Sequence, residues 1–413
     1  MRAFRRHNAA PREASPVIAG RCGMLASAAA LLGLATLTVP GLRAAGLPAS
    51  APDMQRPALV TPVAVFGPDD RVAVPARLDW VAQRIGILFN NRARTVCTAF
   101  CVADNVIATA AHCFAKGQSG VAARFADFNF ARNYDRSRTF VRLEGADTGA
   151  AAQNVTTGDF KLRVRPPIDA AFDWALARVP RNTCPADALK VAPANLDVLI
   201  AEAAAGNIFQ VSYHRDWAQW RPSYSKPCKI ARDFDQITWP AIAPDFMKAE
   251  HMVLHTCDTG GASSGSPILM QTPGGPVVVA INVGTYVQSR TLPDGPQAAA
   301  RQRSDTIANT AVNAFAFNER LDILRQASIL GSGAPMRQLQ ELLVQRGHYA
   351  ARVDGAYGPS LKSAIEAYEQ TASMPVTGLA TETLRQRLLQ DGTHKPAAQP
   401  QTPTSGSGVV PQR

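Results

Sequence analysis

The sequence contains no Cys-x-x-Cys pair and no motif in which His and Glu are spaced to bind a metal ion. Cys97 and Cys101 have no similarly spaced second pair, so a structural zinc site is disfavoured. Aromatic residues make up only 7% of the chain, and no basic run has aromatic residues interleaved with it. We therefore expect no nucleic-acid partner.

Long apolar stretches are also scarce, since only the stretch from Met24 to Pro40 stands out. Six arginines and one acid in residues 1–45 accompany it, so part of the net charge of +11 belongs to this segment. The pattern predicts a signal peptide over residues 1–45, with an uncleaved anchor as the alternative. Because the stretch is short for a membrane span, we expect a periplasmic or secreted protein without stable membrane insertion.

Seven cysteines are present, and one of them, Cys22, lies in the predicted leader. The remaining six form an even set, which after export would allow up to three disulfides.

The chain divides by composition. Residues 46–75 are rich in Pro and Ala and are expected to form an extended lead-in. Short apolar runs separated by turn residues fill 76–330 and predict an all-β domain, closed by an amphipathic helix over 314–330.

A second, smaller domain is expected after a flexible linker over 331–335. Residues 336–390 show helical spacing in three segments separated by glycines, which predicts a small three-helix domain. The tail, residues 391–413, is dominated by Pro, Gln, Ser, Thr and Gly and is expected to be disordered.

Three positions in the β-rich part together suit nucleophilic catalysis. Acyl transfer by a serine needs an exposed hydroxyl, an imidazole that takes its proton, and a carboxylate that orients the imidazole. His112 follows an apolar run, Asp173 opens another, and Ser264 lies in a Gly/Ser-rich stretch between two more. Asp169 and Ser263 are the nearby alternatives for the acid and the nucleophile.

These positions lie in recognisable motifs. The stretch from Cys97 to Cys113, the segment Asp173-Trp-Ala-Leu and the run Ser264-Gly-Ser-Pro resemble the motifs of trypsin-like serine proteases of bacterial type. They also follow the His, Asp, Ser order of chymotrypsin. The resemblance implies a mainly β fold of two six-stranded antiparallel β-barrels, and an endopeptidase that needs neither metal nor organic cofactor.

The resemblance also assigns roles. His112 would be the general base and then the acid, Asp173 would orient it, and Ser264 would form the acyl-enzyme with a protein or peptide substrate. The oxyanion hole would consist of the backbone N–H groups of Ala262 and Ser264. The family usually has Gly where this chain has Ala262, which puts the resting geometry of the hole in question.

A disulfide between Cys97 and Cys113 is implied as well, because the two have the separation found around the family's histidine loop. Four cysteines then remain, and they permit three pairings. One of these joins Cys101 to Cys184 and Cys228 to Cys257.

Substrate preference rests on two positions. Asp258 lies six residues before Ser264, where trypsin carries the aspartate that binds Arg or Lys, although an acid here also suits a turn cap. Asn282 is expected on the wall of the substrate pocket, near where glutamyl endopeptidases commonly carry a His. Both positions argue against cleavage after Glu.

Activation by cleavage is not expected. Proteases activated in that way carry an acid just before the nucleophile, and this chain has Ser263 there. Arg84-Ile-Gly-Ile87 bears only a faint likeness to an activation site.

Residues 336–390 resemble the peptidoglycan-binding-like domain of bacterial cell-wall hydrolases. The matching segments are Leu339–Leu343, Gly347–Tyr349, Val353–Gly355, Tyr357–Pro359 and Val376–Gly378. The resemblance makes peptidoglycan a candidate partner, although such modules also serve as spacers or protein-binding units.

Three functions remain open from the sequence. An exported serine endopeptidase held near the cell wall fits the residues best. A catalytically inert binding protein with the protease fold is the first alternative, supported by Ala262 alone. A cell-wall amidase or peptidase is the second, and the absence of a zinc or cysteine-nucleophile motif argues against it.

Overall fold

The computed structural model describes residues 64–391, apart from 117–119, 135–138, 161, 164, 218–219, 235–236 and 293–300. The predicted signal peptide and the predicted disordered tail lie outside the described residues, except for Asp391. In this described part of the chain, no helix is both long and apolar enough to cross a membrane.

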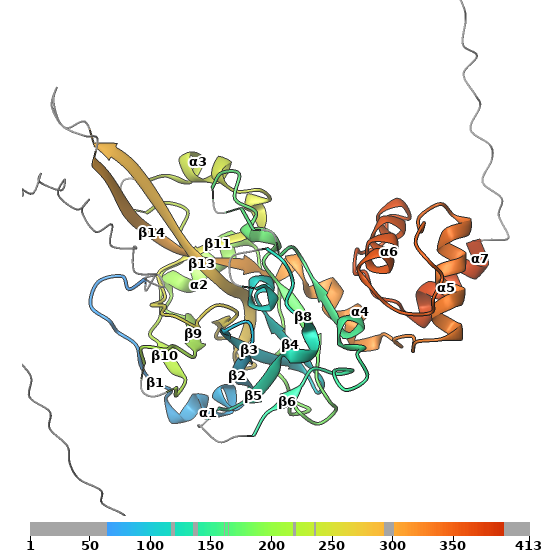
Figure 1. The fold of residues 1–413 in the computed structure, drawn as a ribbon. Helices are drawn as coiled ribbons and strands as arrows, with labels where there is room; N and C mark the ends of the chain where they lie inside the picture. Colours follow the sequence, from blue (N-terminus) through green and yellow to red (C-terminus); the bar gives the residue numbers. More distant parts are fainter. Residues whose placement is uncertain are drawn as a thin grey trace, which may run out of the picture. The chain divides into compact units, whose positions relative to one another are not determined.

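Residues 85–178 build the first of two antiparallel sheets, with the strand order β6-β5-β2-β3-β4-β8-β7 (Figure 1). Apolar and β-branched residues dominate its central strands, and both faces of those strands are buried, which favours extended structure. The strands are β2 (Ile85–Asn90), β3 (Thr95–Ala103), β4 (Val106–Thr109), β5 (Asn129–Arg132), β6 (Val141–Arg142), β7 (Val155–Thr157) and β8 (Ala175–Arg178).

The second sheet has the order β1-β10-β9-β12-β13-β14-β11 and takes one short strand from the lead-in. Its longest members, β13 and β14, pair along most of their length (Figure 1). The strands are β1 (Val72–Ala73), β9 (Ile208–Ser212), β10 (Ser223–Ser225), β11 (Met252–His255), β12 (Pro267–Met270), β13 (Val277–Leu292) and β14 (Arg301–Asn313).

The expectation of a mainly β protein with two antiparallel sheets followed by helices is confirmed. Each sheet has seven described strands where six were expected. Both sheets include a two-residue edge strand, β1 and β6, which is too short to produce an alternating pattern in the sequence. Closure of either sheet into a barrel stays a prediction.

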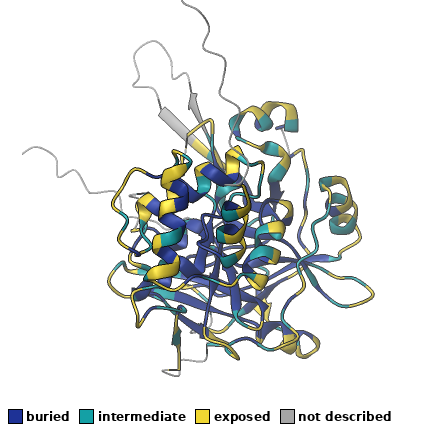
Figure 2. Ribbon diagram, turned by 90° about the vertical axis from the view of Figure 1, so that its right-hand side faces the viewer, coloured by how far each residue is buried: buried dark blue, intermediate teal, exposed yellow. Residues whose placement is uncertain are grey.

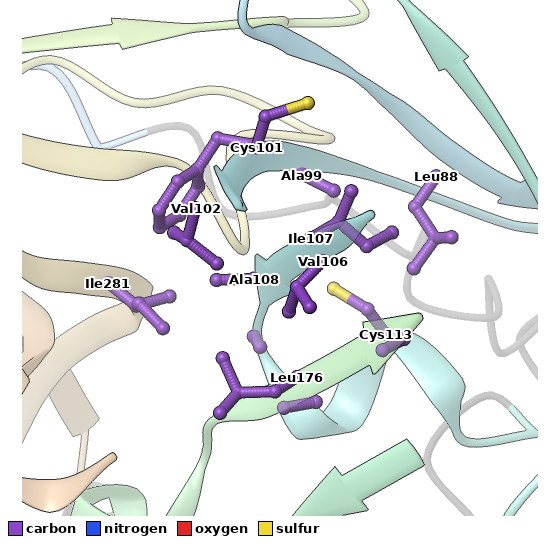
Figure 3. Close-up of a cluster of buried hydrophobic side chains, with 14 of the residues drawn as sticks. Leu88, Ala99, Cys101, Val102, Val106, Ile107, Ala108, Cys113, Leu176 and Ile281 are labelled. Atoms are coloured by element: carbon purple, nitrogen blue, oxygen red, sulfur yellow. The ribbon is translucent and has the colours of Figure 1, made fainter. Parts of the chain in front are cut away.

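The two sheets share a hydrophobic cluster, and the second sheet has two further clusters of its own. Val106, Ile107 and Leu176 of the first sheet belong to the same buried cluster as Ile281 of β13 (Figure 3). Figure 2 shows buried residues concentrated along the strands and exposed residues along the outer sides of the helices. Because protein interiors are close-packed, this shared core holds the strand ends of both sheets in fixed positions.

Short helices connect the strands, and three more form the C-terminal unit. The first group is α1 (Asp79–Ala82), α2 (Leu196–Ala204), α3 (Trp239–Ile242) and α4 (Asn318–Gln326). The helix expected over 314–330 is shorter than predicted: a 3-10 turn over Ala314–Ala316 precedes α4, which ends at Gln326.

The expected three-helix unit is present as α5 (Ala334–Gln345), α6 (Pro359–Thr371) and α7 (Glu382–Asp391). It has a hydrophobic core of its own, with Met336, Leu339 and Ile365 fully buried. Buried Gln340 binds the loop between α5 and α6, since its Oε1 accepts from Gly355 N at 2.8 Å. The glycine-punctuated pattern of the sequence therefore predicted these elements well.

Three disulfides brace the sheets. They join Cys97 to Cys113, Cys101 to Cys184, and Cys228 to Cys257. The first two link segments of the first sheet and its following loop, and the third links the loop after β10 to the loop after β11. The structure thus adopts one of the three pairings that the sequence left open.

The lead-in joins the second sheet from Ala64 onward. Ala64 and Thr259 exchange backbone hydrogen bonds at 3.1 and 3.0 Å, and β1 pairs with β10. Asp258 accepts hydrogen bonds from Phe66 N at 2.9 Å and from Asp70 N at 3.1 Å. Residues 64–75 are thus part of the β domain, which the sequence boundary at residue 76 did not anticipate.

Arg71 fastens this segment electrostatically. Its side chain is 3% exposed and contacts Asp69 at 2.7 Å and Asp216 at 2.9 Å. The guanidinium also lies 5.5 Å from the ring of Trp217. Hydrogen bonds from Arg71 lower the pKa of Asp69 and of Asp216, so both carboxylates stay ionised at neutral pH.

Replacing Arg71→Met should lower the free energy of unfolding by about 2 kcal/mol, because two carboxylates lose a charged hydrogen-bond partner. Urea denaturation would measure the change. The control is Arg92→Met, which removes the exposed Arg92–Asp127 pair at 3.4 Å and should cost less than about 1 kcal/mol. Equal effects of the two substitutions would contradict a fastening role for Arg71.

Candidate active site

His112 lies immediately after the β3–β4 hairpin, in a 3-10 turn over Ala111–Phe114. The disulfide between Cys97 of β3 and Cys113 ties this turn back to the hairpin. Three small residues lie between β4 and His112 or at the end of β4, namely Thr109, Ala110 and Ala111, and all three are fully buried. The turn is therefore held firmly while the imidazole remains 32% exposed.

Asp173 meets His112 through two contacts. Its Oδ2 lies 2.6 Å from His112 Nδ1, and its Oδ1 accepts from the backbone N–H of His112 at 2.9 Å. A short 3-10 turn over Ala170–Phe172 places Asp173 just before β8, where its side chain is 3% exposed. The competing acid, Asp169, instead binds Arg163, whose backbone N–H lies 2.5 Å from its Oδ1.

This geometry sets the state of the imidazole. A carboxylate at Nδ1 can only accept, so the proton lies on Nδ1 and Nε2 keeps its lone pair. Burial lowers the pKa of His112, but the charge and hydrogen bond of Asp173 outweigh it, and the pKa is raised above its usual value. His112 is thus oriented as a base whose protonated form is stabilised.

Ser264 lies on the turn that leads into β12. It is the one residue from Cys257 to Leu269 that is not buried, so its hydroxyl is the accessible one. Ser263 and Ser266 are buried, and the hydroxyl of Ser266 accepts from Gln210 Nε2 at 2.7 Å. Exposure therefore favours Ser264 over Ser263 as the nucleophile.

The turn that carries Ser264, here called the nucleophile turn, lies beside the 3-10 turn that carries His112. Thr98 N of β3 donates to Ser264 O at 2.9 Å. Cys113 Sγ lies 3.9 Å from Ser264 O and 3.9 Å from His112 Nε2. No hydrogen bond between Ser264 Oγ and His112 is present among the described residues, as is common before substrate binds.

Gly265 makes this close approach possible. A Cβ built at Gly265 would lie 2.1 Å from Thr109 Oγ1 and 2.3 Å from Thr98 O, distances that a side chain cannot occupy. Its φ of +84° is also in the region that favours glycine. The nucleophile turn therefore packs against the β3–β4 hairpin by backbone contact.

Ala262 adopts a positive φ of +81°, which is unfavourable for a residue with a Cβ. Its carbonyl accepts from Thr98 Oγ1 at 2.9 Å. Across the described part of the chain, neither Ala262 N–H nor Ser264 N–H donates a hydrogen bond to a protein acceptor. Ala262 thus takes up the glycine-type conformation, and both amides predicted for the oxyanion hole are available to a ligand.

The two predicted substrate-binding residues are both buried, at 2% exposure each. Asp258 directs its oxygens to the backbone of the lead-in, and its own N–H donates to Ser225 Oγ at 3.1 Å. Asn282 of β13 contacts Ser263 and His255. Neither residue presents a free polar group to a substrate pocket in this structure.

Sequence reasoning missed three contributors. Thr98 contacts the nucleophile turn, Arg71 fastens the lead-in, and His255 is the partner of Asn282. The sequence did carry a signal for His255, because it ends the apolar run of β11. A histidine at the end of such a run is expected to be buried, and a buried imidazole requires a hydrogen-bond partner. Thr98 and Arg71 carried no comparable signal.

The bond that bears a faint likeness to an activation site is inaccessible. Arg84 and Ile85 are buried, and Ile85 begins β2. The guanidinium of Arg84 donates to Asp187 O at 2.8 Å. This segment is therefore a structural part of the first sheet.

A bound metal ion needs several donor atoms close to one another. Within the described ranges, the single cluster of donor atoms close enough together is Cys97, His112 and Cys113. Both sulfur atoms are consumed by the disulfide, so this set does not fit a metal ion.

Substituting Asp258→Ala should destabilise the protein by about 2 kcal/mol, since two backbone donors lose a charged acceptor. The ratio of kcat/KM between peptides with Arg or Lys at the cleaved bond and peptides with other residues should not change. Urea denaturation and a peptide panel would measure both, with the half-exposed acid variant Asp127→Ala as control. A selective loss of Arg and Lys cleavage would support the basic-pocket hypothesis instead.

Comparison with known families agrees with this arrangement. The model of the trypsin-like peptidase domain matches residues 97–281, a range that contains His112, Asp173 and Ser264. The model of the peptidoglycan binding domain matches residues 332–388, which covers α5 to α7.

No curated protein matches the chain significantly. Among solved structures, the chain is similar to a Glu endopeptidase in complex with MPD, at 17% identity and a TM-score of 0.40. That match covers 62% of this chain and 97% of the other. The chain therefore carries a trypsin-like peptidase domain followed by a C-terminal domain that matches the peptidoglycan-binding model.

Proposed function

We propose that this protein is an exported serine endopeptidase that cleaves peptide bonds through His112, Asp173 and Ser264 and is held near the cell wall by its C-terminal domain. The observation that carries the proposal is the position of His112. Its Nδ1 is bound by buried Asp173, and its Nε2 lies 3.9 Å from Cys113 Sγ, which itself lies 3.9 Å from the backbone oxygen of Ser264.

The first half of the reaction forms the acyl-enzyme. Ser264 Oγ attacks the carbonyl carbon of the substrate while His112 Nε2 takes the hydroxyl proton, and Asp173 stabilises the resulting imidazolium. The negative charge on the substrate oxygen is accepted by the N–H groups of Ala262 and Ser264. When the tetrahedral intermediate collapses, the C–N bond breaks and His112 gives its proton to the leaving amine.

The second half restores the enzyme. A water molecule gives a proton to His112 Nε2 as its oxygen attacks the acyl carbon, and the same two N–H groups accept the charge again. The ester bond to Ser264 then breaks, and His112 returns the proton to Ser264 Oγ. The products are a carboxylic acid and an amine, and no group outside the chain is required beyond water.

Export is supported by two independent features. Disulfides persist in oxidising compartments and are rare in the cytosol, and the described residues hold three of them. The family model that matches residues 332–388 describes a putative peptidoglycan-binding domain, and peptidoglycan lies outside the cytoplasmic membrane. Together with the leader predicted over residues 1–45, these features favour a periplasmic or secreted location.

A fluorophosphonate probe should label the wild-type protein and the Ser263→Ala variant but not Ser264→Ala, because only an activated serine reacts. His112→Ala should slow labelling by at least about 1,000-fold, since the proton acceptor is lost. Labelling would be followed by gel fluorescence over time. A folded wild-type protein that stays unlabelled would favour the alternative of an inert binding protein.

The C-terminal domain should retain the protein on peptidoglycan. We expect the Ser264→Ala protein to pellet with purified sacculi and the same variant truncated after Gly331 to stay in the supernatant. The inactive background prevents proteolysis from changing the result. Equal distribution of the two forms would argue that the domain serves as a spacer.

A further inference from the structure

A buried pair of polar side chains lies behind the nucleophile turn. His255 at the end of β11 is fully buried, and Asn282 of β13 is 2% exposed. His255 Nε2 lies 3.2 Å from Asn282 Oδ1. Neither side chain reaches solvent, and the reaction described above does not use them.

The hydrogen-bond partners define the state of both side chains. The backbone N–H of Cys257 donates to His255 Nδ1 at 3.2 Å, so Nδ1 is an acceptor and the ring proton lies on Nε2. His255 Nε2–H therefore donates to Asn282 Oδ1, which leaves the NH2 group of Asn282 pointing the other way. Burial lowers the pKa of His255 to about 4, which keeps this neutral form at neutral pH.

The amide of Asn282 ends on the nucleophile turn. Its Nδ2 donates to Ser263 O at 3.1 Å and lies 3.4 Å from Ser263 Oγ. The backbone of Asn282 binds the same turn twice, since Asn282 O accepts from Gly265 N at 2.7 Å and Asn282 N donates to Ser266 O at 2.9 Å. A single residue thus holds the peptides on both sides of Ser264.

The carbonyl that Asn282 binds has a particular importance. Ser263 C=O and Ser264 N–H belong to one planar trans peptide, so they point in opposite directions and turn together. Ser266 N also donates to Ser263 O, at 3.0 Å. Holding the carbonyl on the buried side therefore directs the Ser264 N–H toward the side on which the substrate oxygen develops charge.

The conformation of the nucleophile turn requires hydrogen bonds from another part of the chain. Ala262 has a positive φ of +81°, a conformation that is unfavourable for a residue with a Cβ. Local backbone preference alone would thus favour a different arrangement of this loop. Hydrogen bonds from a second strand offset that cost and retain the arrangement.

We propose that Asn282, oriented by His255, is a positioning residue that sets the direction of the Ser263–Ser264 peptide and thereby keeps the oxyanion hole formed. The role rests on the proposed function of Ser264 as nucleophile. It differs from the substrate contact predicted for Asn282 from the sequence. His255 acts one step further back, through its fixed tautomer, and touches neither substrate nor reacting atoms.

The isosteric variant Asn282→Asp tests the role. Its carboxylate still accepts from His255 but cannot donate to Ser263 O, and it repels that carbonyl. We expect kcat to fall by about 100-fold, the loss typical of removing one oxyanion donor. KM should stay within about threefold, because substrate binding does not use the oxyanion contact.

A second readout separates the oxyanion hole from general loosening. Peptide aldehydes bind by adding Ser264 Oγ and placing an oxyanion in the hole, so their inhibition constant should rise in proportion to the loss in kcat/KM. The matched control is Asn313→Asp. Asn313 lies on β14, is also 2% exposed, and its Nδ2 donates to Ala194 O at 2.9 Å, away from the nucleophile turn. This control should lose stability without losing kcat.

Two substitutions of His255 provide an independent test, His255→Gln and His255→Leu. They test the positioning role even if Asn282→Asp does not fold. Gln retains a donor toward Asn282 and should keep kcat within about tenfold of wild type, whereas Leu should reproduce the loss of about 100-fold. Wild-type kcat and aldehyde affinity in Asn282→Asp, or in His255→Leu, would overturn the positioning role while leaving the nucleophile assignment intact. Failure of the fluorophosphonate probe to label the wild-type protein would overturn both.

Discussion

The backbone of the nucleophile turn lies directly against the backbone of the β3–β4 hairpin at Gly265, where a Cβ would fall 2.3 Å from Thr98 O. This contact joins the sheet that carries His112 and Asp173 to the sheet that carries Ser264. Thr98 strengthens it from the hairpin side, through its backbone N–H to Ser264 O and its hydroxyl to Ala262 O. The position of Ser264 relative to His112 and Asp173 therefore depends on this seam between the two sheets.

Three buried or half-buried histidines illustrate how surroundings decide the chemistry of one residue type. His112 faces the carboxylate of Asp173, and its pKa is raised despite burial. His255 faces an amide, and burial lowers its pKa to about 4. Burial and the charge of Arg71 together lower the pKa of His214 to about 3. Of these three, only His112 has a partner that outweighs burial and so stabilises the imidazolium, which is the state a general base must reach.

Several buried polar groups around the turn have well-defined partners. Asp258 binds the lead-in, His214 Nδ1 accepts from Gly260 N at 3.0 Å, and Asn282 binds Ser263. Ala262 N–H and Ser264 N–H donate to no acceptor in the described part of the chain, and they are the amides that a reacting carbonyl oxygen would need. A loop held by such hydrogen bonds can keep these two donors in place without reorganising during the reaction.

The sequence by itself determined those parts of the protein that depend on residues close together along the chain. The three motifs around His112, Asp173 and Ser264, the β-rich run and the three glycine-separated helices each depend on neighbouring residues, so a pattern of side chains was enough to predict them. Only the tertiary structure decided the roles of Asp258, Asn282 and Arg71. Their partners lie far away along the chain, as with Phe66 and Asp258, which are 192 positions apart, and a hydrogen bond over that separation leaves no periodic trace in the sequence.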